Sequence, residues 1–286
     1  MLSKKDAFIK KLTEIYPNSF DDILNNIKTP KPTIFRVNTI KSSVEDATAE
    51  LTKEGFVLES GPLSQSFIVR SGTKRISETK AFDEGRIYIQ RLSSMLPVLE
   101  LEPKACEKIL DMCAAPGSKT SQIAEESGNL AQITAVENNR NRFFTLKNNL
   151  EKQGVKNFTL ILEAAQFLDR NHPELIGSFD KILLDAPCSN EGFISLDDQA
   201  TLERWNPKLP GKLSKLQKKL VSTGIKLLKP GGTLVYSTCT FSKEENEEVI
   251  EWVLKKFPEM KLEKLKRVTP DRLYSGFFFA KLLKSA

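Results

Sequence analysis

The chain has 286 residues, of which 40% are hydrophobic and 28% charged, and its net charge is +6. This composition is that of a folded globular protein and excludes a disordered chain. No run approaches the roughly 18 apolar residues of a membrane helix, and the charged N-terminus lacks the apolar stretch of a signal peptide, so we expect a cytoplasmic protein that does not bind membranes. The basic excess fits either an ordinary soluble surface or attraction to nucleic acid, and charge alone does not separate the two.

The N-terminal part of the sequence predicts two helices followed by a small mixed module. Apolar residues at helical spacing indicate helices over residues 3–27, which Pro17 divides in two. The pattern that follows predicts strands at residues 33–39, 56–58 and 66–70 and a helix over residues 43–54. The polar segment 71–80 is either a linker or a basic loop. We therefore expect a first domain over residues 1–80 that contains a small α+β module.

Beyond this module, strands and helices alternate, regularly so from Lys108 onward. The expected strands span residues 108–113, 132–137, 158–163, 179–185, 233–237, 261–266 and 275–283. The expected helices span residues 94–101, 143–153, 213–228 and 244–256, and one more starts near Lys119. Repeated strand–helix units predict an α/β fold, with a mostly parallel, doubly wound, Rossmann-like sheet of seven strands in a second domain over residues 81–286.

Three successive strands of this sheet end in a carboxylate, namely Glu137, Glu163 and Asp185. In an open α/β sheet, ligands bind at the carboxyl ends of the strands. A single acidic strand end is ordinarily a solvated boundary residue, whereas three in succession favour a binding edge. A carboxylate at the second strand end is suited to holding ribose hydroxyls.

The first strand of the series instead runs into the small-residue turn Cys113–Thr120, which opens a helix. Small residues let the backbone approach a ligand, and a helix N-terminus favours an anion. The turn lacks the G-x-G-x-x-G pattern of dinucleotide sites, and Met112 stands where a phosphate-binding P-loop needs glycine. S-adenosylmethionine, a nucleoside with a carboxylate tail, matches this edge better than a dinucleotide or ATP.

The four cysteines form no C-x-x-C pair, so we expect no metal site. Cys106 is interpreted as a small buried hydrophobic residue. Cys188 follows the strand that ends at Asp185, and Cys239 emerges from the next strand of the sheet. Because these two strands are expected to be neighbours, the two thiols and the carboxylate should converge at one edge of the sheet.

With these motifs, the chain resembles the Sun-type RNA cytosine-5 methyltransferases. The segments that carry the resemblance are Phe35–Thr39, Tyr88–Gln90, Asp111–Thr120, Asp185–Ser189, Lys229–Gly232, Tyr236–Thr240, Glu244–Glu247 and Gly276–Ala280. The resemblance implies a class I methyltransferase domain that uses S-adenosylmethionine. In size the chain is similar to the compact archaeal-type members that modify tRNA. We therefore expect a monomer that binds RNA, with tRNA favoured over rRNA.

The family also implies catalytic roles for four residues. Cys239 is expected to attack carbon 6 of cytosine, and Cys188 to assist proton removal and product release. DNA cytosine methyltransferases use a Pro-Cys thiol like Cys188 as the nucleophile, so this assignment depends on the family match. Lys119 is the cation expected to favour the thiolate. Asp185 is expected to accept a hydrogen bond from the cytosine amino group and to border the cofactor.

For the cofactor itself, the resemblance implies contacts from the turn and from the strand ends. The methionine part is assigned to Cys113, Ala114, Ala115, Pro116, Gly117, Ser118 and Lys119. Glu137 is assigned to the ribose and Glu163 to the adenine. Arg142 either supports the cofactor site or is a solvated helix residue.

The remaining expectations concern RNA and residues with competing interpretations. Arg36 and the basic loop at residues 71–80 are expected to help the N-terminal module grip RNA. Trp205 either faces a base or packs in the core, and Phe277–Phe279 is interpreted as a core strand.

The alternative functions are an rRNA methyltransferase, a methyltransferase for a small molecule or protein, and a non-catalytic RNA-binding factor. Only the last should tolerate the loss of Cys239 and of cofactor binding.

Overall fold

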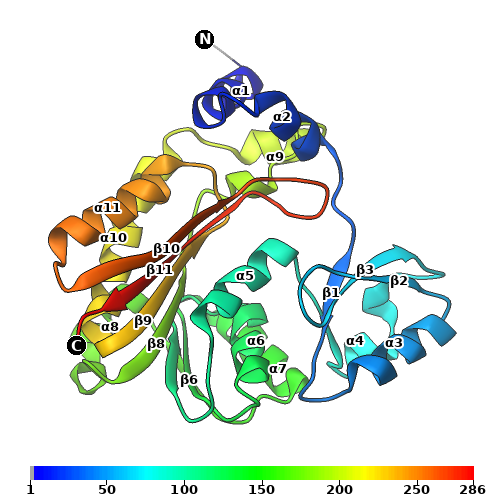
Figure 1. Ribbon diagram of the computed structural model, residues 1–286, viewed down its shortest axis with the longest axis horizontal. Helices are drawn as coiled ribbons and strands as arrows, with labels where there is room; N and C mark the ends of the chain where they lie inside the picture. Colours follow the sequence, from blue (N-terminus) through cyan, green and yellow to red (C-terminus); the bar gives the residue numbers. More distant parts are fainter. Residues whose placement is uncertain (1–2) are drawn as a thin grey trace. The chain divides into compact units, whose positions relative to one another are not determined.

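The computed structural model describes residues 3–286, which form two compact units (Figure 1). The first unit comprises the chain up to Lys31 together with Gln166–Ser178 and Leu184–Ala286. The second comprises Pro32–Ala165 and Phe179–Leu183. No helix among residues 3–286 is both long and apolar enough to cross a membrane.

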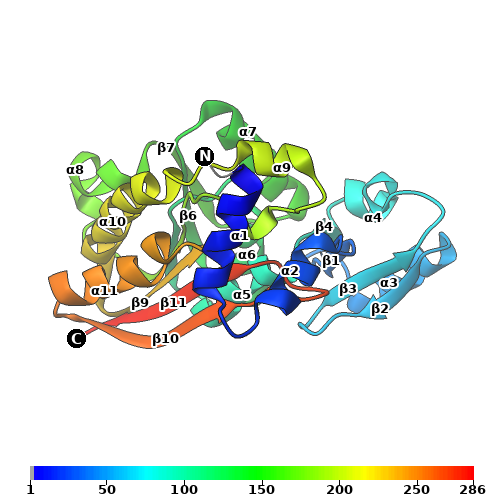
Figure 2. The same ribbon diagram turned by 90° about the horizontal axis from the view of Figure 1, so that it is seen from above.

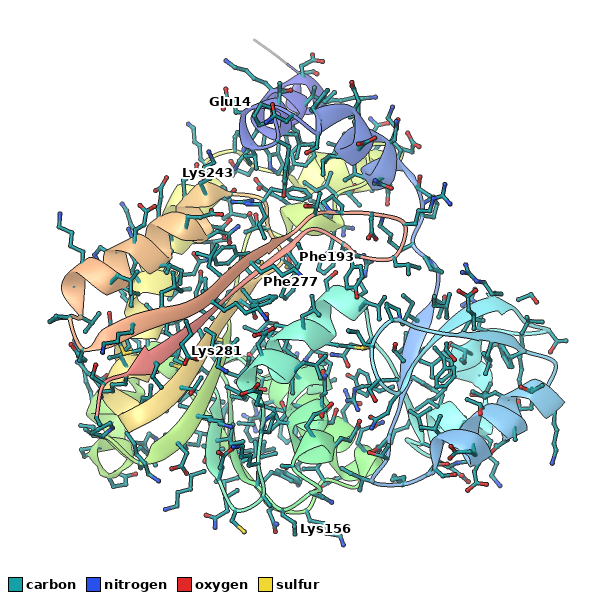
Figure 3. All side chains as sticks on the ribbon, viewed as in Figure 1. Glu14, Lys156, Phe193, Lys243, Phe277 and Lys281 are labelled. Atoms are coloured by element: carbon teal, nitrogen blue, oxygen red, sulfur yellow. The ribbon has the colours of Figure 1, made fainter. Side chains whose placement is uncertain are left out.

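The first unit combines helices with an antiparallel strand group. Its helices are α1 (Lys4–Ile15), α2 (Phe20–Lys28), α8 (Leu168–Asn171), α9 (Gln199–Arg204), α10 (Leu209–Leu227) and α11 (Glu247–Lys256). Its strands are β9 (Leu228–Thr238), β10 (Met260–Val268) and β11 (Phe277–Lys284), and β11 pairs antiparallel with both of the others. Phe277, labelled in Figure 3, is buried together with Phe278 and Phe279, which confirms the predicted core strand.

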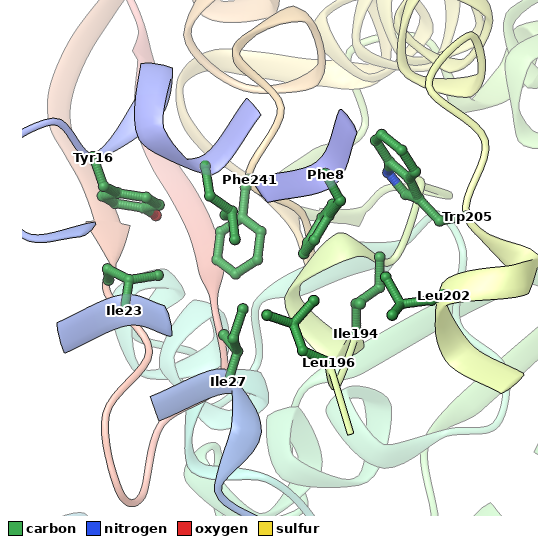
Figure 4. Packing of buried hydrophobic residues seen from close by; sticks show 10 residues of the cluster. Phe8, Tyr16, Ile23, Ile27, Ile194, Leu196, Leu202, Trp205 and Phe241 are labelled. Atoms are coloured by element: carbon green, nitrogen blue, oxygen red, sulfur yellow. The ribbon is translucent and has the colours of Figure 1, made fainter. Parts of the chain in front are cut away.

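Helices α1 and α2 pack against the segments that follow two strands, β8 (Phe179–Asp185) and β9, and this packing forms an aromatic core (Figure 4). The Phe8 ring meets Trp205 edge-on, with the ring centroids 5.2 Å apart. Tyr16 meets Phe241 in the same way at 5.8 Å. Helix α1 also lies beside α9 (Figures 1 and 2). Trp205 is buried in this cluster, so the core-packing interpretation of this residue is the correct one.

The second unit contains two groups of strands. Its strands are β1 (Ile34–Val37), β2 (Val57–Ser60), β3 (Ser66–Ser71), β4 (Ile87–Ile89), β5 (Lys108–Asp111), β6 (Gln132–Glu137) and β7 (Phe158–Leu162). Its helices are α3 (Val44–Lys53), α4 (Lys80–Asp83), α5 (Leu92–Leu101), α6 (Ser118–Glu126) and α7 (Arg140–Gln153). The first four strands form an antiparallel sheet in the order β2-β3-β1-β4. Strand β6 pairs in parallel with both β5 and β7.

The sheet order confirms the expected α/β class. Seven strands are hydrogen-bonded in the order β10-β11-β9-β8-β5-β6-β7, and β8 pairs in parallel with β5. Three βα units supply the parallel part, because a crossover helix is needed between parallel neighbours. The C-terminal hairpin of β10 and β11 makes the sheet mixed. The domain boundary expected at residue 80 stays a prediction.

Two elements differ from the sequence expectation. The segment 71–80 contains a short 3-10 helix at Ile76–Glu78, and Ile76 is buried among the apolar residues of the N-terminal module. Strand β9 starts at Leu228, so it includes Pro230 and the glycine pair, which lie between the expected helix and the expected strand. Its pairing with β11 begins only at Thr233, which agrees with the predicted strand.

Two residues were placed wrongly by sequence reasoning. Cys106 is exposed and not buried, in a loop where its backbone has a φ of 66°. Arg36 does not face RNA, because its side chain is only 2% exposed. Its guanidinium forms an ion pair with Glu125 and donates to Ser121 at 2.7 Å, so it joins β1 to helix α6. A buried cation needs such partners to offset its lost hydration.

A tight backbone approach in the first unit provides a stability test. A Cβ atom at Gly192 would lie 2.0 Å from the carbonyl oxygen of Gly276 and 3.0 Å from that of Cys239. We predict that Gly192→Ala lowers the free energy of unfolding by about 1–3 kcal/mol, because the backbone has to move. Chemical denaturation measures this change.

The matched control is Gly211→Ala, where a Cβ meets nothing within 4 Å inside helix α10. This substitution should be neutral or stabilise by up to about 1 kcal/mol, because alanine is the better helix former. Equal stability of the two variants would contradict the predicted clash.

Candidate active site

Two thiols meet in the first unit, each carried by a loop that follows a strand. Cys188 comes after β8, and Pro187 before it ends the strand because it has no N–H to donate. Cys239 follows β9 directly. The two sulfur atoms are 2.9 Å apart, and the backbone N–H of Cys239 donates to the Cys188 sulfur at 3.3 Å. The predicted convergence of the two cysteines, both half-buried and neither in a disulfide, is thus observed.

A carboxylate and an amide lie with these thiols. Asp185, the last residue of β8, accepts a hydrogen bond from the Ser237 hydroxyl at 2.6 Å. The Cys239 thiol donates to Asn190 Oδ1 at 2.9 Å. Asn190 has a left-handed backbone with a φ of 57°, which asparagine tolerates better than most residues. This turn brings its amide back towards the sulfur atoms.

The backbone on both sides of Cys188 is held by a buried pair, Gln217 of α10 and Glu245. Gln217 Nε2 donates to the Pro187 carbonyl and to Glu245 Oε2, each at 2.9 Å. The N–H of Ser189 donates to the same carboxylate oxygen at 3.0 Å, and its hydroxyl also donates to Glu245. Both peptide groups next to Cys188 are therefore fixed. This arrangement sets the position of the thiol before any substrate binds.

Burial dominates the electrostatics of this pair. It raises the pKa of Glu245, although the hydrogen bonds from Ser189 and Gln217 act in the opposite direction. Burial also raises the pKa of Tyr236 well above its usual value of 10. The Tyr236 hydroxyl consequently stays protonated and donates to the Glu245 carbonyl at 2.6 Å.

A second buried carboxylate, Glu191, joins the two cysteine loops to helix α1. It is 0% exposed and accepts from Thr240 at 3.0 Å and from Ser242 at 2.7 Å, two residues that follow Cys239. Trp205 Nε1 donates to it at 2.9 Å, and Lys11 of α1 forms an ion pair with it at the same distance. These partners satisfy a carboxylate that burial alone would disfavour.

These supporting residues were absent from the predicted site. Glu245 lies inside the segment Glu244–Glu247, which carried part of the family resemblance but suggested no role. Gln217 had one usable signal, since it is a polar residue on the otherwise largely apolar buried face of a helix. Asn190 and Glu191 gave no such signal, because their partners come from distant parts of the chain.

In the second unit, the turn after β5 forms a small-residue cradle. Ala114 N donates to the Val136 carbonyl at 2.9 Å, which ties the turn to β6. Gly117 has a φ of 104°, and a Cβ there would lie 3.1 Å from Leu146, so glycine suits this position. Helix α6 starts at Ser118 with no side-chain cap. Its first N–H groups therefore suit an anionic ligand.

The strand-end carboxylate Glu137 is linked to this cradle by Arg142. Glu137 is 3% exposed and accepts from the Asn139 N–H at 2.9 Å. Arg142 Nη1 lies 3.3 Å from Glu137 Oε2, and its Nη2 donates to the Ala115 carbonyl at 2.6 Å. Arg142 thus contacts Glu137 and the turn as well as solvent. These contacts favour the interpretation that Arg142 supports the cofactor site over that of a solvated helix residue. Glu163, directly after β7, donates its backbone N–H to the Glu137 carbonyl at 3.1 Å.

Lys119 is buried in the first turn of α6. Its Nζ donates to Ser94 Oγ at 2.7 Å. The next residue, Thr120, donates to Asp111 at 2.7 Å and so fixes the helix to the end of β5. The expected action of Lys119 on a cysteine thiol stays a prediction. Among residues 3–286, no group of three or more histidine, cysteine or acidic side chains could hold a metal ion.

Comparison with known proteins identifies the family. The family model described as 16S rRNA methyltransferase RsmB/F matches residues 98–283. The chain belongs to this family. A second model, the ferredoxin-like domain of RsmF/B-like methyltransferases, matches residues 6–74. The Sun-type family expected from the motifs is thereby confirmed.

Individual relatives agree with this assignment of the chain to the RsmB/F family. Ribosomal RNA small subunit methyltransferase F of Klebsiella pneumoniae (strain 342) is 37% identical over 262 residues, which cover 89% of this chain and 54% of the relative. The chain therefore spans about half the length of the curated relatives it matches.

Two solved structures from Pyrococcus horikoshii are also similar. A methyltransferase homologue is 34% identical with a TM-score of 0.83, covering 96% of this chain and 93% of the other. NSun6, solved with SFG, is 27% identical with a TM-score of 0.85, covering 98% of both chains.

The raised pKa of Glu245 predicts a pH-dependent stability for this RsmB/F family chain. The folded protein binds the proton of the Glu245 carboxyl more tightly than the unfolded chain does. The stabilisation that results is complete below pH 4.5 and is lost as the pH rises through the raised pKa of Glu245. Glu245→Gln removes the titration. Relative to this variant, the wild-type free energy of unfolding should fall as the pH rises from about 4 to about 8. Urea denaturation across that range measures it.

Glu244→Gln is the matched control, because Glu244 is the half-buried neighbour of the same chemistry. The fall in stability with rising pH that is assigned to Glu245 should persist in this variant. A difference between wild type and Glu245→Gln that stays constant over the whole pH range would contradict the assigned role of burial.

Proposed function

We propose that this chain transfers a methyl group from S-adenosylmethionine to carbon 5 of a cytosine in RNA. The observation that carries the proposal is the pair of thiols 2.9 Å apart, from the loops after β8 and β9, with the Asp185 carboxylate at the end of β8 three residues before Cys188. A methyltransferase for a small molecule or protein has no need of two such cysteines. A non-catalytic RNA-binding factor has no need of the buried hydrogen bonds that fix the Cys188 backbone.

Carbon 5 of cytosine is too weak a nucleophile to accept a methyl group directly. In the proposed reaction, the Cys239 thiolate forms a bond to carbon 6, which leaves an enamine that is nucleophilic at carbon 5. Carbon 5 takes the methyl group and then loses its proton to a base. The sulfur–carbon 6 bond breaks and releases the product. Cys188, next to the nucleophile, assists the last two steps.

The cytosine is distinguished from uracil by its amino group. We propose that Asp185 accepts a hydrogen bond from this group. Uracil presents an oxygen there, so the half-buried Asp185 would be shielded from water by the base without gaining a donor, at a cost of roughly 1–3 kcal/mol. The base has to leave its stack to reach the thiols, so single-stranded or splayed RNA is the expected substrate.

The second unit fits S-adenosylmethionine, which supplies an electrophilic methyl group when bound. The uncapped start of α6 and the turn Cys113–Lys119 suit the carboxylate of the methionine part. Glu137, held by Arg142, suits the ribose hydroxyls, and Glu163 follows on the adenine side. We assign Lys119 to favouring the thiolate, because an ordinary thiol with a pKa of about 8.5 is mostly protonated near neutrality.

We propose 16S rRNA as the substrate. Relatives with 37% identity are named for small-subunit rRNA, and this favours rRNA over the tRNA that the chain's size suggested. tRNA is the alternative substrate. The protein is proposed to act as a cytoplasmic monomer, with residues 1–80 contributing RNA contacts other than Arg36.

Bisulfite sequencing of total RNA from cells with and without the gene tests the activity and the substrate together. We expect one or more cytosines of 16S rRNA to lose protection when the gene is deleted. Loss of protection only in tRNA would replace the proposed substrate. Unchanged protection in all RNA would contradict the activity.

The roles of the two cysteines predict different fates for two variants. With 16S rRNA and S-adenosylmethionine, Cys188→Ala should accumulate a covalent protein–RNA adduct on a denaturing gel, because the methylated product is not released. Cys239→Ala should form none, because the attacking atom is gone. Cys106→Ala, an exposed thiol elsewhere, serves as the control and should behave as the wild type. The opposite pattern would exchange the two roles.

A further inference from the structure

The positive charge of the chain is concentrated in one segment. Residues 204–243 contain nine lysines and arginines and no aspartate or glutamate. The remainder has 34 basic residues, 43 less these nine, against 37 acidic ones, so it is net acidic. The basic character of the protein therefore comes from this segment, of which helix α10 is the largest element.

Helix α10 presents these lysines on one face. Lys212, Lys215, Lys219 and Lys226 are all exposed, at spacings of three, four and seven residues that place them in one stripe. At about 1.5 Å per residue, the stripe is roughly 21 Å long. The opposite face is buried. Apart from Gly211, every exposed residue of α10 is a lysine.

The stripe leads into a pocket of about 350 Å³ formed by α8, α10 and α11, which lie together in Figures 1 and 2. The basic residues lining it are Arg170, Lys218, Lys219, Lys226 and Lys256. Its one acidic residue, Asp169, is paired with Lys226 at 2.6 Å. Trp252 lies between two of the cations, with Lys218 Nζ at 5.7 Å and Lys256 Nζ at 4.7 Å from the ring centroid. The ring restricts both side chains by cation–π attraction.

The lysine stripe of α10, together with Arg170 and Lys256, is named here the α10 surface. We propose that the α10 surface binds the phosphate backbone of the RNA substrate away from the reacting cytosine. The inference rests on the proposed function for the identity of the polyanion. Like charges held together disfavour one another unless an anion neutralises them, and regularly spaced phosphates do so along a stripe of this length. Lysine contacts to phosphate position an RNA without reading its sequence.

The exposed face of the helix also argues against other partners. It carries no large apolar side chain, and the pocket adds only Phe167 and Trp252, whereas protein interfaces depend on clusters of buried aromatic and aliphatic anchors. Insertion into a membrane interface likewise needs an apolar face opposite the charges, and here that face is buried within the unit.

The test is the triple variant Lys212→Gln, Lys215→Gln and Lys219→Gln. Filter binding of 16S rRNA transcripts at several KCl concentrations should show affinity about 10- to 100-fold weaker near 0.1 M salt. The slope of log affinity against log salt should fall in magnitude by about 2–3, since three phosphate contacts are lost. Methylation at saturating RNA should be unchanged, because the lysines do not belong to the cysteine cluster.

A second triple variant is the matched control, with Lys104, Lys156 and Lys261 each changed to glutamine, all outside residues 1–80. These lysines are exposed and scattered over other elements, and Lys156 is labelled in Figure 3. The change in net charge is the same, so its affinity should stay within about twofold of the wild type. Equal losses in the two triple variants would overturn the inference, because net charge and not the α10 surface would then matter.

Two further outcomes separate the inference from its alternatives. Unchanged affinity and salt slope in the α10 variant, with normal wild-type methylation, would overturn the inference and leave the proposed function standing. If the α10 variant kept its RNA affinity but lost binding to phosphatidylglycerol vesicles, the surface would belong to a membrane contact. A wild-type protein that neither binds nor methylates RNA would contradict the proposed function itself.

Discussion

Two buried carboxylates hold the loops that carry the cysteines. Glu245 takes hydrogen bonds from Gln217 and from the residue after Cys188, and Glu191 takes them from residues after Cys239. Loops are ordinarily the most mobile part of a fold, and a nucleophile on a mobile loop loses the benefit of fixed orientation. Here both loops are restrained by buried hydrogen bonds to the carboxyl oxygens of Glu245 and Glu191.

In the second unit, polar side chains likewise hold the backbone of the proposed cofactor turn. A cofactor cradle needs backbone close to the ligand, so its residues are small and its helix start is left uncapped. Arg142 then joins the Glu137 carboxylate to the turn, so the strand end and the helix start keep a common position. Polar side chains thus support the backbone in both units, and the residues expected to touch a ligand form only part of each network.

Much of the fold was predictable from the sequence. Apolar runs with periods of about two and 3.6 residues located nearly every strand and long helix, and Gly and Pro marked most of their ends. The short helix α9 and the 3-10 turn at Ile76 were missed, because short elements depend on tertiary packing. Cys106 and Arg36 were misplaced for the same reason, since burial of a single residue is decided by its neighbours in space.

The site was predictable to the extent that its residues lie in short motifs. Cys188, Cys239 and Asp185 stand at strand ends, where topology brings them together. Glu191 could not be found this way, because Lys11, Trp205 and Ser242 come from three separate parts of the chain.

The ion pair of Lys11 with Glu191 also has a consequence for folding. The two residues are 180 positions apart, so the first helix must wait for most of the chain before it reaches its partner. Contacts this distant in sequence form late and slow folding, because the loop that they close costs entropy. During synthesis, α1 leaves the ribosome long before the segment that it covers. The cysteine loops therefore acquire their final support only after both distant parts of the chain have met.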